Sequence, residues 1–137
     1  MKEIRKPKKD SSERIAAPSS SANAQQFDHP IFCLRHIQAG YDIADCTPEQ
    51  RMQLLEQLRN LSKLTWNEIR SAHRHGLGTE KIPTSIIKPA IPRPPATDDV
   101  TFLAFRFAGK APMVGFRAGA AFRILWLDHN FSVYRHE

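Results

Sequence analysis

Four arginines stand in the C-terminal part of the sequence, one in each of four runs of aromatic and β-branched residues. Arg106, Arg117, Arg123 and Arg135 each fall inside or at the end of such a run. A guanidinium group can donate two hydrogen bonds to one phosphate, so a sheet with an arginine on each strand offers a positive surface to an anion. The alternative is that these arginines keep a sheet edge soluble and prevent aggregation.

The end of the chain adds groups that could act with these arginines on RNA. RNA is cleaved without a metal when its 2′-hydroxyl attacks the adjacent phosphate, which requires a base, an acid and cations that stabilise charge on phosphorus. Arg106, Arg117 and Arg123 would line one groove as the cations, with Tyr134 and His136 as acid and base. Further groups of this kind are His129 and the pair Glu80-Lys81.

Other basic residues are candidates for contacts to RNA: Lys81, Lys110, Arg135, His73, Arg74 and His75. The last three also end a predicted helix, where cations suit the negative end of the helix dipole, and this explains them equally well. Cys33 and Cys46 lack the paired spacing of zinc ligands, so the sequence predicts two reduced thiols, no metal and no cofactor.

The elements that would position these groups are short strands. They are VTFLAFRF (100–107), MVGFR (113–117), AFRILWLD (121–128) and FSVYRH (131–136). The breaks between them contain Gly, Pro or Asn, which favour tight turns. Connections this short predict a four-stranded antiparallel meander. The third run is apolar on both sides, which predicts a central strand covered on both faces.

The N-terminal half predicts one strand and two helices. The run IFCLRHI (31–37) suits a strand that joins the sheet, although a short helix is an alternative. A helix over 48–61 follows the capping box of Thr47 and Gln50. Its apolar face is expected to hold Met52, Leu55, Leu58 and Leu61, with Leu54 beside them. A second capping box, Thr65 to Glu68, opens a helix over 66–73 with Trp66 and Ile69 inward.

Two segments differ in composition from the rest of the chain. Residues 1–26 hold six Lys or Arg residues and few apolar ones, which predicts a flexible arm that contacts phosphates or only solubilises the protein. The length of the rest, residues 27–137, predicts a single domain. The five prolines in residues 83–95 predict an extended loop that wraps over its surface, with a polyproline ligand for another domain as the alternative.

Composition limits the classes of partner. The chain has 137 residues and a formal net charge of +6, which favours an acidic partner such as nucleic acid. No apolar run approaches the ~20 residues of a membrane span, and no apolar stretch of a secretory signal follows the charged start. The sequence therefore predicts an α+β protein of the cytoplasm, with two N-terminal helices on a mainly antiparallel, twisted sheet of four to five strands.

The order of strand, helical pair and arginine-bearing meander with a Tyr/His ending resembles the RelE/ParE superfamily of bacterial toxins, over roughly residues 28–136. The resemblance implies a metal-independent endoribonuclease that cleaves messenger RNA, on the ribosome or free, and a cognate antitoxin protein as partner. By position, Arg106, Arg117 and Arg123 match the family's sheet arginines, and Tyr134 and His136 its C-terminal Tyr or His. The basic arm and the proline-rich loop are longer than the family usually has. The alternative function is a non-catalytic module that binds nucleic acid or protein.

Overall fold

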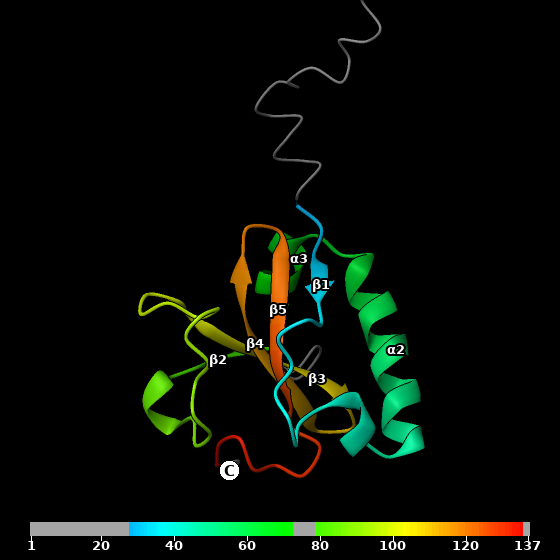
Figure 1. Cartoon of the computed structure of the whole chain (residues 1–137). Helices are drawn as coiled ribbons and strands as arrows, with labels where there is room; N and C mark the ends of the chain where they lie inside the picture. The colour runs from blue at the N-terminus through cyan, green and yellow to red at the C-terminus, as the bar shows by residue number, and fades with distance from the viewer. Residues whose placement is uncertain (1–27, 73–78, 136–137) are drawn as a thin grey trace, which may run out of the picture.

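The computed structural model describes residues 28–72 and 79–135. These residues form an α+β fold with two helices and a five-stranded, mostly antiparallel sheet (Figure 1). The strands are β1 (Ile31–Cys33), β2 (Glu80–Ile82), β3 (Phe102–Ala108), β4 (Ala111–Ala118) and β5 (Ala121–Leu127). The helices are α2 (Pro48–Ser62) and α3 (Trp66–Ser71), with single 3₁₀ turns η3 (Ile43–Asp45) and η4 (Thr84–Ile86). The predicted fold class is confirmed.

Both predicted capping boxes begin their helices. The Thr47 hydroxyl accepts from the Gln50 N–H at 3.1 Å, and the Gln50 side chain accepts from the Thr47 N–H at 2.8 Å. Thr65 and Glu68 make the same reciprocal pair, at 3.0 and 2.9 Å. Each box satisfies two backbone donors that the first helical turn would leave unpaired.

The sheet has the order β1-β5-β4-β3-β2. The antiparallel meander β3-β4-β5 is confirmed, and β5 is an internal strand as predicted. β1 joins β5 in parallel and is regular only over Ile31–Cys33. The chain then leaves β5 and returns where the Gln38 N–H donates to the Leu125 carbonyl at 2.8 Å. β2 pairs antiparallel with β3 and has no counterpart among the strands predicted from the sequence.

The fourth predicted strand, over 131–136, is wrong for the described residues 131–135, which contain no strand. The buried Asp128 carboxylate accepts from the Ser132 N–H at 2.6 Å and the Val133 N–H at 3.1 Å. Phe131 has a φ of +58°. This turn directs the chain across the sheet, where the Val133 carbonyl accepts from the Lys88 N–H at 2.7 Å.

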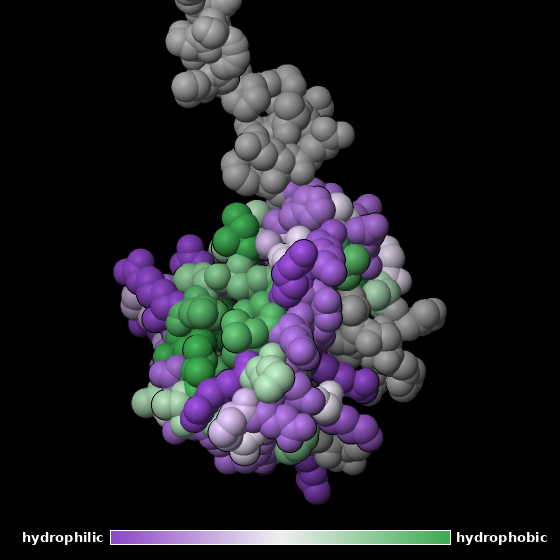
Figure 2. Space-filling view, turned by 90° about the vertical axis from the view of Figure 1, so that its right-hand side faces the viewer, coloured by the Kyte–Doolittle hydropathy of each residue, from purple (hydrophilic) through white to green (hydrophobic). Residues whose placement is uncertain are grey.

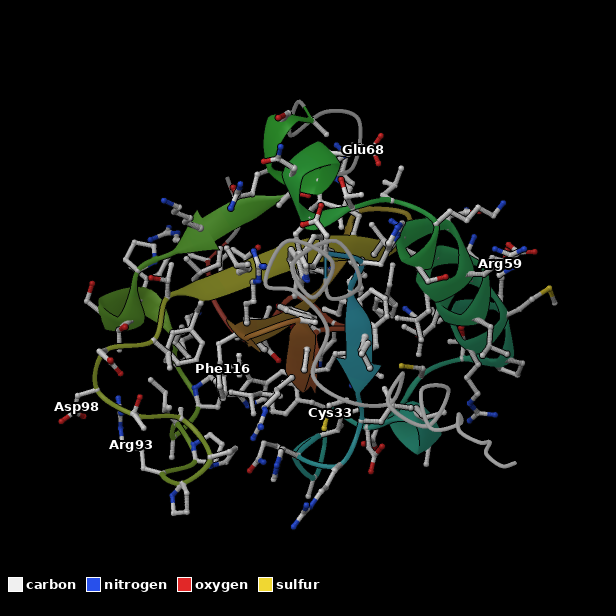
Figure 3. All side chains as sticks on the ribbon, turned by 90° about the horizontal axis from the view of Figure 1, so that it is seen from above. Cys33, Arg59, Glu68, Arg93, Asp98 and Phe116 are labelled. Carbon is white, nitrogen blue, oxygen red and sulfur yellow. The ribbon has the colours of Figure 1, made fainter. Side chains whose placement is uncertain are left out.

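Both faces of the sheet are buried. One face meets α2 and α3 in the helix-side core, which includes Leu61, Trp66, Phe105, Phe122 and Ile124. The other face meets the proline-rich loop and the C-terminal segment in the loop-side core, whose residues include Ile82, Ala96, Phe102, Phe116, Leu125, Trp126, Val133 and Tyr134. In Figure 3 the helices and the proline-rich loop with Arg93 and Asp98 lie on different sides of the strands. The proline-rich loop therefore covers the sheet, as the sequence predicted.

The predicted inward stripe of α2 is partly wrong. Leu61 is buried, and Leu58 is half-buried against the helix-side core. Leu54, which the pattern placed beside them, is also buried, whereas Met52 and Leu55 are 60% and 69% exposed. Trp66 and Ile69 of α3 are buried, as predicted. Within the described residues, no helix is long and apolar enough to span a membrane.

Candidate nucleic-acid interface

Trp66 is a fixed anchor at the start of α3. Its backbone N–H donates to the Asp28 carbonyl at 2.6 Å, and its indole Nε1 donates to the Ala120 carbonyl at 3.0 Å. The ring is 1% exposed and packs near Phe105 and Phe122. Trp66 thus connects the first described residue, α3 and the β4–β5 turn through its backbone and its side chain together.

Arg117 lies on this anchor. Its guanidinium carbon is 4.4 Å from the centre of a Trp66 ring, a cation–π distance, and its Nε donates to the Gly119 carbonyl at 2.7 Å. Arg117 is nevertheless exposed to solvent. Two contacts therefore hold the orientation of a charge that can still meet a ligand.

A second arginine lies close enough to act on this charge. Burial lowers the pKa of Arg117, and the positive charge of Arg70 lowers it further, while Asp28 acts in the opposite direction. Arg70 is exposed and donates to the Asn67 side chain at 2.6 Å. Within residues 28–72 and 79–135, neither arginine forms an ion pair with a carboxylate. Two like charges close together favour an anion between them.

We call the end of the molecule that carries Lys63, Arg70 and Arg117 the basic end. Figure 1 shows α3, the start of β1 and the β4–β5 turn together at the top of the fold. Lys63 is the exposed C-cap residue of α2, and the Leu64 carbonyl next to it is 3.0 Å from His29 Nδ1. Glu68, an acid of this region, caps the Thr65 N–H. The basic arm precedes Asp28 in the sequence, and His73, Arg74 and His75 follow α3.

Arg123 lies on the opposite face of the sheet from Arg117. It is paired with Phe116 of β4 and Cys33 of β1, and Phe116 belongs to the loop-side core. Paired residues project to the same face, so Arg123 faces the loop side, whereas Arg117 lies on the helix-side residue Trp66. The Arg123 Nε is buried and has no hydrogen-bond partner in the described part of the chain.

Arg106 lies apart from both Arg117 and Arg123. It pairs with Pro112, whereas Arg123 pairs with Phe116 four residues farther along β4, or about 13 Å at the rise of a strand. Phe105 and Phe107 are both in the helix-side core, so alternation directs the Arg106 side chain to the loop side. The prediction that Arg106, Arg117 and Arg123 line one groove is therefore wrong. The sequence pattern located the three strands correctly, but it does not determine to which face of the sheet each arginine side chain projects.

A second constellation lies at the β2 edge. The hydroxyl of the buried Tyr134 donates to the Glu80 carboxylate at 3.1 Å. Glu80 is paired with Ala104, so Arg106, two residues along β3, is its diagonal neighbour on the same face, at about 7–8 Å between backbones. An acid, a phenol and an arginine thus share this edge. Tyr134 and Arg106 were predicted as site residues, whereas β2, which brings Glu80 to them, was not predicted.

The other predicted contact residues are dispersed. Lys81 is exposed on β2, Lys110 is exposed in the β3–β4 turn, and Arg135 is exposed after Tyr134. His73, Arg74, His75 and His136 lie outside the described residues, as do the predicted arm residues. Arg70 and Lys63 were not anticipated, because both follow an amphipathic pattern that equally fits a solvated helix end.

A polar groove of about 330 Å³ lies between α2 and the β3–β4 turn. Gln53, Gln57 and Asn60 of α2 border it together with Gly109, and the Gln57 amide donates to the Arg106 carbonyl at 2.7 Å. In the described part of the chain, no group of three or more His, Cys, Asp or Glu side chains is placed to hold a metal ion. Cys33 and Cys46 are free thiols, and burial raises the pKa of Cys46.

Comparison with protein-family models, curated proteins and solved structures finds no match for this chain. The resemblance to the RelE/ParE superfamily stays a prediction, and so do the function and the antitoxin partner that it implies.

Proposed function

We propose that this protein binds single-stranded RNA through the basic end. The observation that carries this proposal is Arg117, which is held over Trp66 at 4.4 Å and tied to the Gly119 carbonyl while it remains exposed. An oriented guanidinium loses less conformational freedom when it binds a phosphate than a free one does. Arg70 beside it and Lys63 at the end of α2 extend the positive surface.

The charge of the whole chain supports a polyanion as the ligand. The chain has 20 Lys or Arg residues against 14 Asp or Glu residues. Residues 1–27, which precede Asp28 in the sequence, hold six of these cations and three acids. Contacts to phosphate supply most sequence-independent affinity for nucleic acid, so a basic end of this kind predicts binding that depends strongly on salt.

The test is the affinity of the full chain for a fluorescein-labelled 20-nucleotide RNA, measured by fluorescence anisotropy at low salt. Arg117→Ala and Arg70→Ala should each raise Kd by about tenfold, because each removes a phosphate contact. Lys88→Ala is the matched control: it removes one exposed charge from the proline-rich loop, away from the basic end, and should leave Kd nearly unchanged. If all three substitutions raised Kd equally, the affinity would depend only on net charge, and the proposed site would be refuted.

Metal-independent cleavage of RNA is the second candidate function. The observation that favours it is the hydrogen bond from Tyr134 to Glu80, with Arg106 as diagonal neighbour of Glu80 on the same face. A carboxylate and a phenol can act as base and acid for attack by the 2′-hydroxyl, and an arginine can stabilise the phosphorane. Arg117 and Arg123 do not join this group, so their catalytic role is not part of the candidate.

Cleavage is tested by single-turnover incubation with labelled messenger RNA, with and without ribosomes, in the presence of a chelator. The products should end in a 2′,3′-cyclic phosphate and a 5′-hydroxyl. Tyr134→Phe keeps the buried ring but removes the hydroxyl, and Glu80→Gln removes the charge; each should lower the rate by about 10²-fold or more. Intact RNA after incubation with the wild-type protein would reject cleavage without affecting the proposal of binding.

A further inference from the structure

The polar groove between α2 and the β3–β4 turn is lined by amide and carboxylate side chains. Gln53, Glu56, Gln57 and Asn60 line it from α2, and Gly109 lines it from the turn. We call it the amide groove. Figure 2 shows a mainly hydrophilic surface on the side of the molecule that carries α2. The volume of the groove, about 330 Å³, is at the lower end of the range for small-ligand sites, roughly 300–1,000 Å³, and suits a ligand the size of one nucleotide.

The amide of Gln57 has a fixed orientation in this groove. Its Nε2 donates to the Arg106 carbonyl at 2.7 Å. Because a carbonyl oxygen only accepts, the amide nitrogen must face the backbone, and Oε1 points away from it. Among the described residues, Oε1 has no donor of its own. An acceptor that is already held in place loses little conformational freedom when a ligand donates to it.

The other polar side chains of the groove retain their hydrogen-bonding capacity for a ligand. Within residues 28–72 and 79–135, the side chains of Gln53, Glu56 and Asn60 form no hydrogen bond and no ion pair. The Glu56 carboxylate only accepts, and the nitrogen of Gln57 is already used, so acceptors exceed donors in the lining. The groove therefore favours a neutral ligand with N–H groups, whereas the charge of Glu56 repels a phosphate.

The amide groove leads to the basic end along one flank of α2. Residues three and four apart are neighbours on the surface of a helix, so Gln53, Glu56, Asn60 and Lys63 form one stripe. Lys63, the C-cap residue, still has helical backbone angles, with φ −80° and ψ −16°. The stripe is about 15 Å long at the rise of an α-helix. An RNA strand with a phosphate on Lys63 thus has a neighbouring base beside the groove.

We propose, on the basis of the RNA binding proposed above, that the amide groove binds an unpaired base with an exocyclic amino group. The amino group of cytosine or adenine donates to Glu56 and to Gln57 Oε1, a pairing that carboxylates and amides make with base edges. Uracil has a carbonyl oxygen where cytosine has its amino group. In the groove, uracil therefore sets an acceptor against an acceptor, which leaves both unpaired.

The test compares the Kd of the full chain for labelled oligocytidylate and oligouridylate of equal length, by fluorescence anisotropy at low salt. The two bases share a pyrimidine ring, so stacking contributes little to the difference. The wild-type protein should bind oligocytidylate about tenfold more tightly than oligouridylate. Glu56→Ala should reduce this preference to about twofold or less, and Gln53→Ala should also reduce it. Neither side chain forms a hydrogen bond within the described chain, so both variants should fold.

Asp98→Ala is the matched control for the lost charge. Asp98 is fully exposed on the proline-rich loop, away from the amide groove. Removal of either carboxylate raises the affinity for both RNAs through charge alone, so the ratio of the two dissociation constants reports on the groove. Asp98→Ala should leave this ratio unchanged. A ratio that falls equally in Asp98→Ala and Glu56→Ala would overturn the proposal.

The same measurement separates a failure of the groove from a failure of the basic end. If the wild-type protein bound both oligonucleotides equally and Arg117→Ala weakened both, the amide groove would be rejected and the basic end would stand. If the wild-type protein bound neither oligonucleotide, the RNA-binding function and the base-binding groove would both be rejected.

Discussion

At the scale of single residues, Trp66 connects the fold to the proposed function. Its ring is buried in the helix-side core between α3 and the sheet. The same ring contacts the guanidinium group of the exposed Arg117. A residue of this kind lets a stable core set the direction of a surface charge. A flexible lysine side chain at this position would lose more conformational entropy when it binds a phosphate.

Asp128 has a comparable structural role at the C-terminal turn. It is the charged residue among the fully buried side chains of the described chain, and its two oxygens accept from the backbone of Ser132 and Val133. Asp128→Asn replaces one acceptor by a donor that faces an N–H group. We expect a loss of about 1–3 kcal/mol in the free energy of unfolding, measured by urea denaturation. The exposed Asp98 supplies the control, since Asp98→Asn should change stability by less than about 0.5 kcal/mol.

The residue scale is also where sequence reasoning was weakest. Alternation and turn residues located the strands that carry Arg106, Arg117 and Arg123. Their faces depend on irregularities that no local pattern encodes. Register shifts occur between Val114 and Gly115 and near the end of β3, and Leu125 and Trp126 both belong to the loop-side core although they are adjacent. A single extra residue in a strand reverses the face of every side chain after it.

At the scale of elements, helix starts were predictable and helix faces were less so. The capping boxes at Thr47 and Thr65 each join residues only three positions apart, so they can be predicted from the sequence alone. The inward face of α2 depends on what lies beside it. Leu54 and Leu61 are buried in the helix-side core, while Met52 and Leu55 are exposed to solvent.

Gly115 controls how closely β4 and β5 can lie at the register shift. A Cβ placed on it would be 2.0 Å from the Arg123 carbonyl oxygen, which is backbone and cannot rotate away. Gly115→Ala should therefore separate the two strands and lower the free energy of unfolding by about 3 kcal/mol or more. Gly109→Ala is the control: open space surrounds it, and its φ of +60° should cost only about 1–2 kcal/mol. Equal losses for the two variants, measured by urea denaturation, would show that this contact does not limit the strand spacing.

At the scale of the whole molecule, the sheet has two covered faces made by different kinds of chain. Helices cover one face, while the proline-rich loop and the C-terminal segment cover the other. The prolines limit the freedom of the unfolded loop, so a segment without regular structure can cover a core at low entropic cost. The sequence identified this segment and predicted that it wraps over the surface. It did not predict that Arg70 and Arg117 lie near each other, because that depends on the path of α3 relative to the β4–β5 turn.

The salt dependence of RNA binding tests the central claim of a phosphate-binding basic end most directly. The dissociation constant of the full chain for the labelled 20-nucleotide RNA is measured from low to high potassium chloride, for the wild-type protein and for Arg117→Ala. We predict that affinity falls steeply with salt for the wild-type protein, and that the slope of log K against log salt is shallower by about 0.7 for the variant, the value for one lost contact to a single strand. Parallel slopes for the two proteins, or no binding by the wild-type protein at low salt, would contradict the account.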